Sequence, residues 1–150
     1  MVNLLELGIT LPDASAALAN YVPYVISGKH VYFSGQICRE GGEIVYKGQV
    51  GKDLTIEEAH KAARLCALNL LAQLNHACKG NLNQVARCVK LVVFIASAPE
   101  FSRHSEVANG ASELFVEVFG DQGRHARSSI GVSSLPLNTA VEVEAVFELK

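Results

Sequence analysis

The last strand-like segment of the chain alternates between two kinds of side chain, and this pattern constrains the fold more than any other. In TAVEVEAVFEL, successive side chains would point to opposite faces of a strand. One face carries Val141, Val143, Ala145 and Phe147, and the other carries Glu142, Glu144 and Val146. The apolar face predicts that helices pack against it. The half-charged face must also meet something, and we expect it to lie in a subunit interface.

The segments upstream predict one mixed β-sheet. Strand patterns occur at 21–28, 30–36 and 41–50, a helix at 55–79, a strand at 88–97, a helix at 101–119, and strands at 126–132 and 140–149. Strand–helix–strand connections favour parallel pairing, and hairpins favour antiparallel pairing. We therefore predict an α+β fold with both helices on one face of the sheet. Residues 1–150 form one domain in this interpretation, with 1–19 as an irregular lead-in.

Local signals place the first boundaries. Gly28-Lys29 separates two strand patterns and predicts a hairpin turn. Pro23 favours an edge position or a bulge for the first strand, because proline cannot donate to a ladder. Thr55 and Glu58 have the spacing of a capping box, which predicts that the first helix begins there.

Two features of the second half need a packing explanation. The 88–97 strand is a nearly continuous β-branched run, which is typical of a central strand buried on both faces. Asn109-Gly110 falls inside the second helix, where glycine costs about 1 kcal/mol relative to alanine. We expect either close packing at this point or a helix that starts later.

The composition disfavours several classes of protein. The chain has 150 residues, enough for one domain with a core, and its low charge argues against disorder. A net charge of −2 without a basic run argues against nucleic-acid binding. No window is long and apolar enough to predict a membrane span, and we expect no secretory signal. We therefore expect a cytoplasmic protein without nucleic-acid or membrane partners.

The cysteines predict no metal site. Cys38, Cys66, Cys78 and Cys88 form no CxxC pair, and no histidine lies at ligand spacing from any of them. In a reducing compartment we interpret them as free thiols that behave as small hydrophobic residues.

Arg127 is the leading candidate for a binding residue. It lies in HARSSIGVSSLP, ahead of the strand that carries Glu142 and Glu144, so we expect a permanent cation near two carboxylates. A guanidinium group presents a planar fork of donors that matches a carboxylate. The pattern favours a site in which the guanidinium group binds the carboxylate of a small acid and a glutamate acts as a base beside it. An ordinary interfacial salt bridge between Arg127 and Glu142 is the alternative.

Several short motifs occur in an order and spacing that point to a known family. They are Tyr21 in ANYVPYV, Ser34-Gly35-Gln36, Ala-Arg-Ser around Arg127, Leu135-Pro136, and VEVEA ending at Ala145. Together they resemble the RidA-like family of reactive intermediate/imine deaminases, also called endoribonuclease L-PSP-like. The resemblance implies a chorismate-mutase-like, L-PSP-like fold and a homotrimer whose sheets line a central barrel. It also implies ligand clefts between subunits and hydrolysis of 2-aminoacrylate and related enamines or imines to 2-oxo acids and ammonia, without metal or cofactor.

The resemblance implies roles for seven residues. Arg127, Gly35, Ser129 and Asn109 would bind the substrate, and Glu142, Ser34 and Tyr21 would act in catalysis. Arg127 would hold the substrate carboxylate with the backbone N–H of Gly35 as a second donor, and Glu142 would orient or activate water. Three of these residues have an alternative, structural role. Ser34 could cap a strand end, Tyr21 could pack in an interface, and Asn109 could hold the backbone.

Two residues beside Arg127 depart from the family pattern. His125 stands where proline is common, and Ser129 stands where cysteine is frequent. These departures indicate a divergent branch and motivate a second hypothesis, a non-catalytic trimer that binds a small carboxylate metabolite. His125 is also a candidate replacement for a proton-transfer group. A ribonuclease, as the older family label suggests, is disfavoured by the acidic net charge and the lack of a basic groove.

Overall fold

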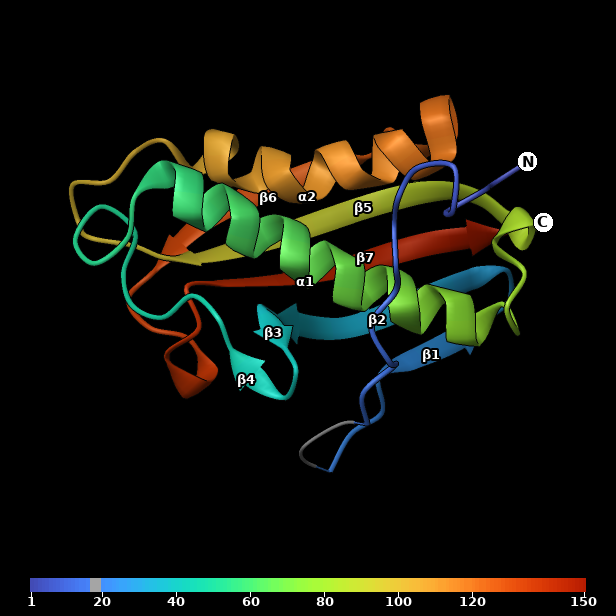
Figure 1. Cartoon of the computed structure of the whole chain (residues 1–150), viewed down its shortest axis with the longest axis horizontal. Helices are drawn as coiled ribbons and strands as arrows, with labels where there is room; N and C mark the ends of the chain where they lie inside the picture. The colour runs from blue at the N-terminus through green and yellow to red at the C-terminus, as the bar shows by residue number, and fades with distance from the viewer. Residues whose placement is uncertain (17–19) are drawn as a thin grey trace.

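A five-stranded sheet carries two helices on one of its faces (Figure 1). The structure is a computed structural model and describes residues 1–16 and 20–150. Its helices and strands are β1 (Tyr24–Ser27), β2 (His30–Ile37), β3 (Arg39–Glu40), β4 (Glu43–Ile44), α1 (Ile56–Ala77), β5 (Val85–Ala96), α2 (His104–Phe119), β6 (Ala126–Val132) and β7 (Val141–Leu149). The predicted α+β class is confirmed.

The strand order within the sheet is β1-β2-β7-β5-β6. β5 and β6 run parallel, whereas the other neighbouring pairs are antiparallel, which confirms the predicted mixed sheet. The predicted 88–97 strand is an interior strand that pairs with β6 and β7, but the prediction that it is buried on both faces is wrong within one chain. β7 takes the middle position, and β5 lies next to the edge strand β6. Val92 and Phe94, on the face of β5 away from the helices, are only half-buried.

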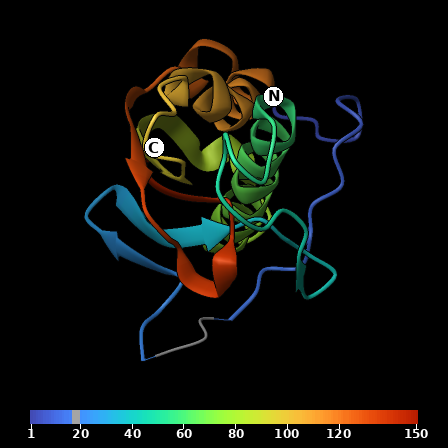
Figure 2. The same cartoon turned by 90° about the vertical axis from the view of Figure 1, so that its left-hand side faces the viewer.

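The two faces of β7 differ as the alternation predicts. Val141, Val143 and Phe147 are fully buried, whereas Glu142 and Glu144 are half-buried on the other face. Both helices lie on the apolar side, as the end-on view in Figure 2 shows. The core therefore fills the layer between sheet and helices.

Gly110 explains how the two helices approach each other. A Cβ at this position would overlap the backbone carbonyl of His60 in α1, so only glycine fits. α2 begins at His104, later than the predicted residue 101. The close packing that we expected at Asn109-Gly110 is confirmed, whereas the later start still leaves this pair inside the helix.

The predicted hairpin and capping box are also present. Ser27 pairs with His30 across a two-residue turn at the β1–β2 connection. At the start of α1, Thr55 Oγ1 accepts a hydrogen bond from the Glu58 N–H at 3.2 Å, and Glu58 Oε2 accepts one from the Thr55 N–H at 3.1 Å.

The prediction of a strand at 41–50 is wrong. Only the two-residue strands β3 and β4 pair with each other, and Gly41 and Gly42 form the turn between them with positive φ angles of 59° and 83°. Beyond this ladder the segment makes only isolated bridges. The glycines of this segment form turns, and turns interrupt the ladder of hydrogen bonds between strands. Residues 1–16 contain no helix or strand, although Ile9 packs into the core, and residues 17–19 of the predicted lead-in lie outside the described part.

Candidate functional site

Glu142 and Gly35 meet on the sheet face away from the helices. The register of β2 against β7 shifts between Phe33 and Gln36, which makes an irregularity in β2 at Ser34-Gly35. The Glu142 carboxyl lies over Gly35, so that an added Cβ would be 2.9 Å from both Cγ and Cδ of Glu142. A missing side chain at residue 35 is therefore what lets the carboxyl occupy this position.

The environment of Glu142 favours its protonated form. Burial raises the pKa of Glu142 above its usual range, and the nearby Glu144 carboxylate raises it further. Among the described residues, no side chain donates a hydrogen bond to this carboxyl. A carboxyl whose pKa is raised in this way gives up its proton less readily than an ordinary glutamate and can act as a proton donor.

Ser34 and Tyr21 border the same region. Ser34 Oγ donates a hydrogen bond to the Val22 carbonyl at 2.6 Å, and the Ser34 N–H donates to the Pro23 carbonyl at 2.9 Å. These contacts hold the segment that carries Tyr21 against the irregular part of β2. The Tyr21 side chain is exposed. The hydroxyl hydrogen of Ser34 is thus committed to the backbone just ahead of β1.

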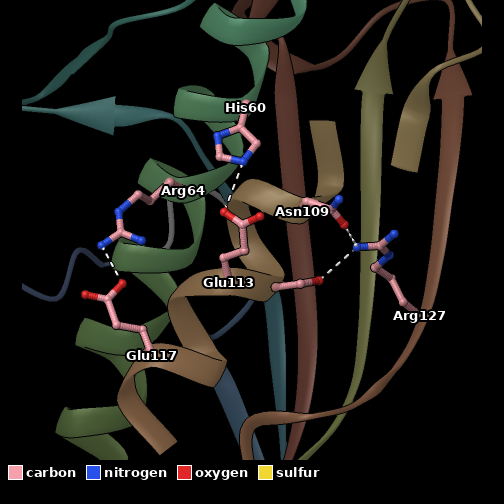
Figure 3. A network of polar contacts seen from close by, with 7 residues as sticks. His60, Arg64, Asn109, Glu113, Glu117 and Arg127 are labelled. Atoms are coloured by element: carbon pink, nitrogen blue, oxygen red, sulfur yellow. Dashed lines mark hydrogen bonds and ion pairs between the residues drawn. The ribbon is translucent and has the colours of Figure 1, made fainter. Parts of the chain in front are cut away.

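Arg127 forms a second group, on the helix side of the sheet (Figure 3). It lies in β6 in register with Leu91, whose side chain is fully buried beneath the helices. Its Nη1 donates hydrogen bonds to Asn109 Oδ1 at 2.8 Å and to Ser112 Oγ at 3.0 Å. Asn109 and Ser112 are three residues apart on α2 and so share one helix face. Ser129, two residues after Arg127, is half-buried on the same side of β6.

His125 is joined to this group through Ser112. Its Nδ1 lies 2.6 Å from the Gly123 carbonyl and its Nε2 lies 2.8 Å from Ser112 Oγ. Burial lowers the pKa of His125, the hydrogen bond to Gly123 opposes this, and the Arg127 charge lowers it further. Both ring nitrogens are occupied, so His125 does not offer a free proton-transfer group. Ser112 was not predicted from the sequence, although its spacing from Asn109 is a usable signal.

Arg127 and Glu142 do not lie together within one chain. β5 separates β6 from β7, and Arg127 is in register with Leu91 of β5 whereas Glu142 is in register with Phe94. Leu91 and Phe94 are an odd number of residues apart, so their side chains point to opposite faces. Each chain therefore contributes two separate groups, and in the part of the chain that is described Arg127 forms no ion pair with a carboxylate.

All four cysteines are free and buried, as expected. Among the described residues, no cluster of three His, Cys, Asp or Glu side chains could hold a metal ion. Within 1–16 and 20–150, no helix has the length and apolar character needed to span a bilayer.

Comparison with known proteins places the chain among homologues. A family profile described as "YjgF/chorismate_mutase-like, putative endoribonuclease" matches residues 2–149. Protein TCP17 of Trypanosoma cruzi is 49% identical over 148 residues, which are 98% of this chain and 92% of that protein. The crystal structure of Atu1372 from Agrobacterium tumefaciens is similar with a TM-score of 0.92 at 48% identity, over 98% of this chain and 90% of that one. E. coli TdcF, solved with bound serine, has a TM-score of 0.66 at 25% identity, over 91% of this chain and 94% of that one.

These matches confirm the predicted resemblance at the level of family and fold. The profile covers nearly every residue, and the relatives align over almost their full length. The order of elements, with two helices on one face of a mixed sheet, agrees with that assignment. The chain belongs to the YjgF/chorismate mutase-like family, also labelled L-PSP-like.

Proposed function

We propose that the protein hydrolyses small reactive enamines and imines, such as 2-aminoacrylate, to 2-oxo acids and ammonia. The observation that carries the proposal is the way Arg127 is held. Asn109 and Ser112 both bind its Nη1, so Nε and Nη2 remain to bind a carboxylate side-on. The relative TdcF has been solved with bound serine, a small amino acid that carries such a carboxylate.

The site that we propose lies between two copies of the chain. Because Arg127 and Glu142 lie on opposite sides of the sheet, a single chain cannot bring both to one small ligand. The Glu142 face also exposes apolar residues, since Val25, Tyr32 and Ile130 are 53%, 49% and 44% exposed. Burying them between copies is favourable. We propose a homotrimer whose sheets line a central barrel, with Glu142 of one copy opposite Arg127 of the next.

The proposed reaction begins with Glu142 protonated, which its raised pKa supports. Arg127 and the Gly35 N–H hold the substrate carboxylate while Glu142 gives its proton to C3 of 2-aminoacrylate, which becomes a cationic imine. The Glu142 carboxylate then takes a proton from water as the water oxygen bonds to C2. Glu142 passes this proton to nitrogen and accepts the hydroxyl proton as the C–N bond breaks. Ammonia and pyruvate leave, and Glu142 is protonated again.

Ser34 and Tyr21 have supporting roles in this proposal. Ser34 Oγ retains lone pairs that can accept from the attacking water, although its hydrogen is bound to the Val22 carbonyl. The Tyr21 hydroxyl is exposed at the edge of the same region and can close it from solvent.

The test generates 2-aminoacrylate in situ and follows pyruvate release above the spontaneous rate. Arg127→Ala should lower kcat/KM about 10- to 100-fold, because hydrogen bonds between charged partners contribute about 1.5–3 kcal/mol. Arg124→Ala is the matched control, since Arg124 is exposed and pairs only with Asp121 among the described residues. An Arg127→Ala protein as active as wild type would contradict the proposal.

A second candidate is a trimer that binds a small carboxylate without turnover. The observation that favours it is that His125 and Ser34 are both committed to internal hydrogen bonds, which leaves few groups free for proton transfer. Binding of pyruvate without hydrolysis of any imine in a panel would support this candidate over the enzyme. RNA cleavage that survives stringent purification and disappears in Glu142→Ala would instead support the ribonuclease named in the family description.

A further inference from the structure

A directed chain of hydrogen bonds ends on Arg127. The Gly123 carbonyl can only accept, so Nδ1 of His125 must carry the ring hydrogen at their 2.6 Å contact. Nε2 of a neutral ring is then an acceptor, and the Ser112 hydroxyl donates to it across 2.8 Å. Ser112 Oγ thereby turns a lone pair toward Arg127 Nη1, 3.0 Å away. The Gly123 carbonyl thus determines the tautomer of His125 and, through it, the direction of the Ser112 hydroxyl.

This chain restricts the orientation of the guanidinium group. Nη1 has two hydrogens, and Asn109 Oδ1 and Ser112 Oγ accept one each. Two acceptors on one nitrogen fix rotation of the planar group. In the described part of the chain no acceptor contacts Nε or Nη2, which form the edge that matches a carboxylate bidentately.

The neutral form of His125 is part of the arrangement. An imidazolium would donate from both nitrogens, so the Ser112 hydroxyl hydrogen would lose its acceptor. It would also place a second cation near Arg127. Burial and the Arg127 charge both lower the pKa of His125 and so favour the neutral ring.

We infer that Ser112 and His125 are positioning residues that aim the Nε–Nη2 edge of Arg127 at a planar carboxylate. The inference rests on the proposed function, because it assigns a role to residues behind the proposed carboxylate clamp. It also gives His125 a task other than proton transfer.

The test measures the Kd of pyruvate, the unreactive product, by calorimetry. Ser112→Ala and His125→Leu should each weaken binding about fivefold, as expected for loss of one hydrogen bond in the chain. His125→Gln retains an amide oxygen for the Ser112 hydroxyl and should rescue most of the loss. Ser105→Ala, at an exposed position of the same helix, should bind like wild type.

A double-mutant comparison separates positioning from general structural damage. In an Arg127→Ala background, Ser112→Ala should cause no further loss, because it acts only through the guanidinium group. An equal loss in both backgrounds would overturn the inference, as would wild-type affinity in Ser112→Ala. Those results leave the proposed function standing if Arg127→Ala itself binds poorly. Wild-type affinity in Arg127→Ala would instead overturn the clamp, and the inference with it.

Discussion

Replacing Gly35 with alanine should destabilise the protein through a single contact. The added Cβ would lie 2.9 Å from both Cγ and Cδ of Glu142, well inside van der Waals separation. Gly35 is not among the residues with positive φ, so alanine adds no backbone strain there. Overpacking costs about 1–3 kcal/mol. We expect about 1–2 kcal/mol, because the half-buried Glu142 side chain can rotate partly out of the way.

A double-mutant cycle isolates this contact. In a Glu142→Ala background, Gly35→Ala should cost nothing or stabilise by up to about 1 kcal/mol, because alanine restricts the unfolded chain. In a Glu144→Ala background the full cost should remain, since the three atoms nearest to the added Cβ all belong to Glu142. The coupling free energy between residues 35 and 142 should be about 1–2 kcal/mol.

Urea unfolding followed by circular dichroism measures each free energy of unfolding. All variants must be compared at one protomer concentration, because association would stabilise the folded chain. If Gly35→Ala costs the same with and without the Glu142 side chain, then Glu142 does not lie over Gly35 and the description of this group is wrong.

Three further predictions test other parts of the structure. Because the pKa of Glu142 is raised in the folded state, the folded chain binds more protons than the unfolded chain, and wild-type stability falls as pH rises through the folded pKa. Glutamine does not titrate, so the difference in Tm between Glu142→Gln and wild type should grow in favour of Glu142→Gln from about pH 4 to about pH 7. Gly110→Ala should cost about 2–3 kcal/mol in urea unfolding despite the better helix propensity of alanine, because the His60 carbonyl cannot move aside. Thr55→Ala should cost about 1 kcal/mol, whereas loss of a surface threonine elsewhere should cost little.

Local features of the fold could be predicted because their causes are local. The capping box at Thr55 and Glu58 depends on residues three apart, and the hairpin at Gly28 depends on a two-residue turn. The alternation of β7 separates an apolar face from a charged one without knowledge of its neighbours. The order of strands depends on long-range pairing, so the sequence did not reveal that β7 lies between β2 and β5.

The orientation of Arg127 could not be predicted for a related reason. In ARSSIGV the apolar residue Ile130 and Arg127 fall on opposite faces, and hydrophobic pattern alone would turn the Ile130 face toward the core. The structure does the reverse, since Ile130 is 44% exposed and Arg127 faces α2. An edge strand with its apolar side uncovered is understandable if another copy covers it. Within the described part of one chain, no helix covers the Ile130 face of β6. The periodicity of the sequence therefore could not predict which face of this strand is turned toward the helices.

The central proposal is that one site takes Arg127 from one copy and Glu142 from another. Mixing Arg127→Ala chains with Glu142→Ala chains, after joint unfolding and refolding, tests this directly in the 2-aminoacrylate assay. Each variant alone should be at least about tenfold less active than wild type. If the two residues come from different copies, about a quarter of the sites in randomly mixed trimers should regain both residues, and activity should appear at about that fraction of wild type. Mixed trimers no more active than either parent would contradict the proposal.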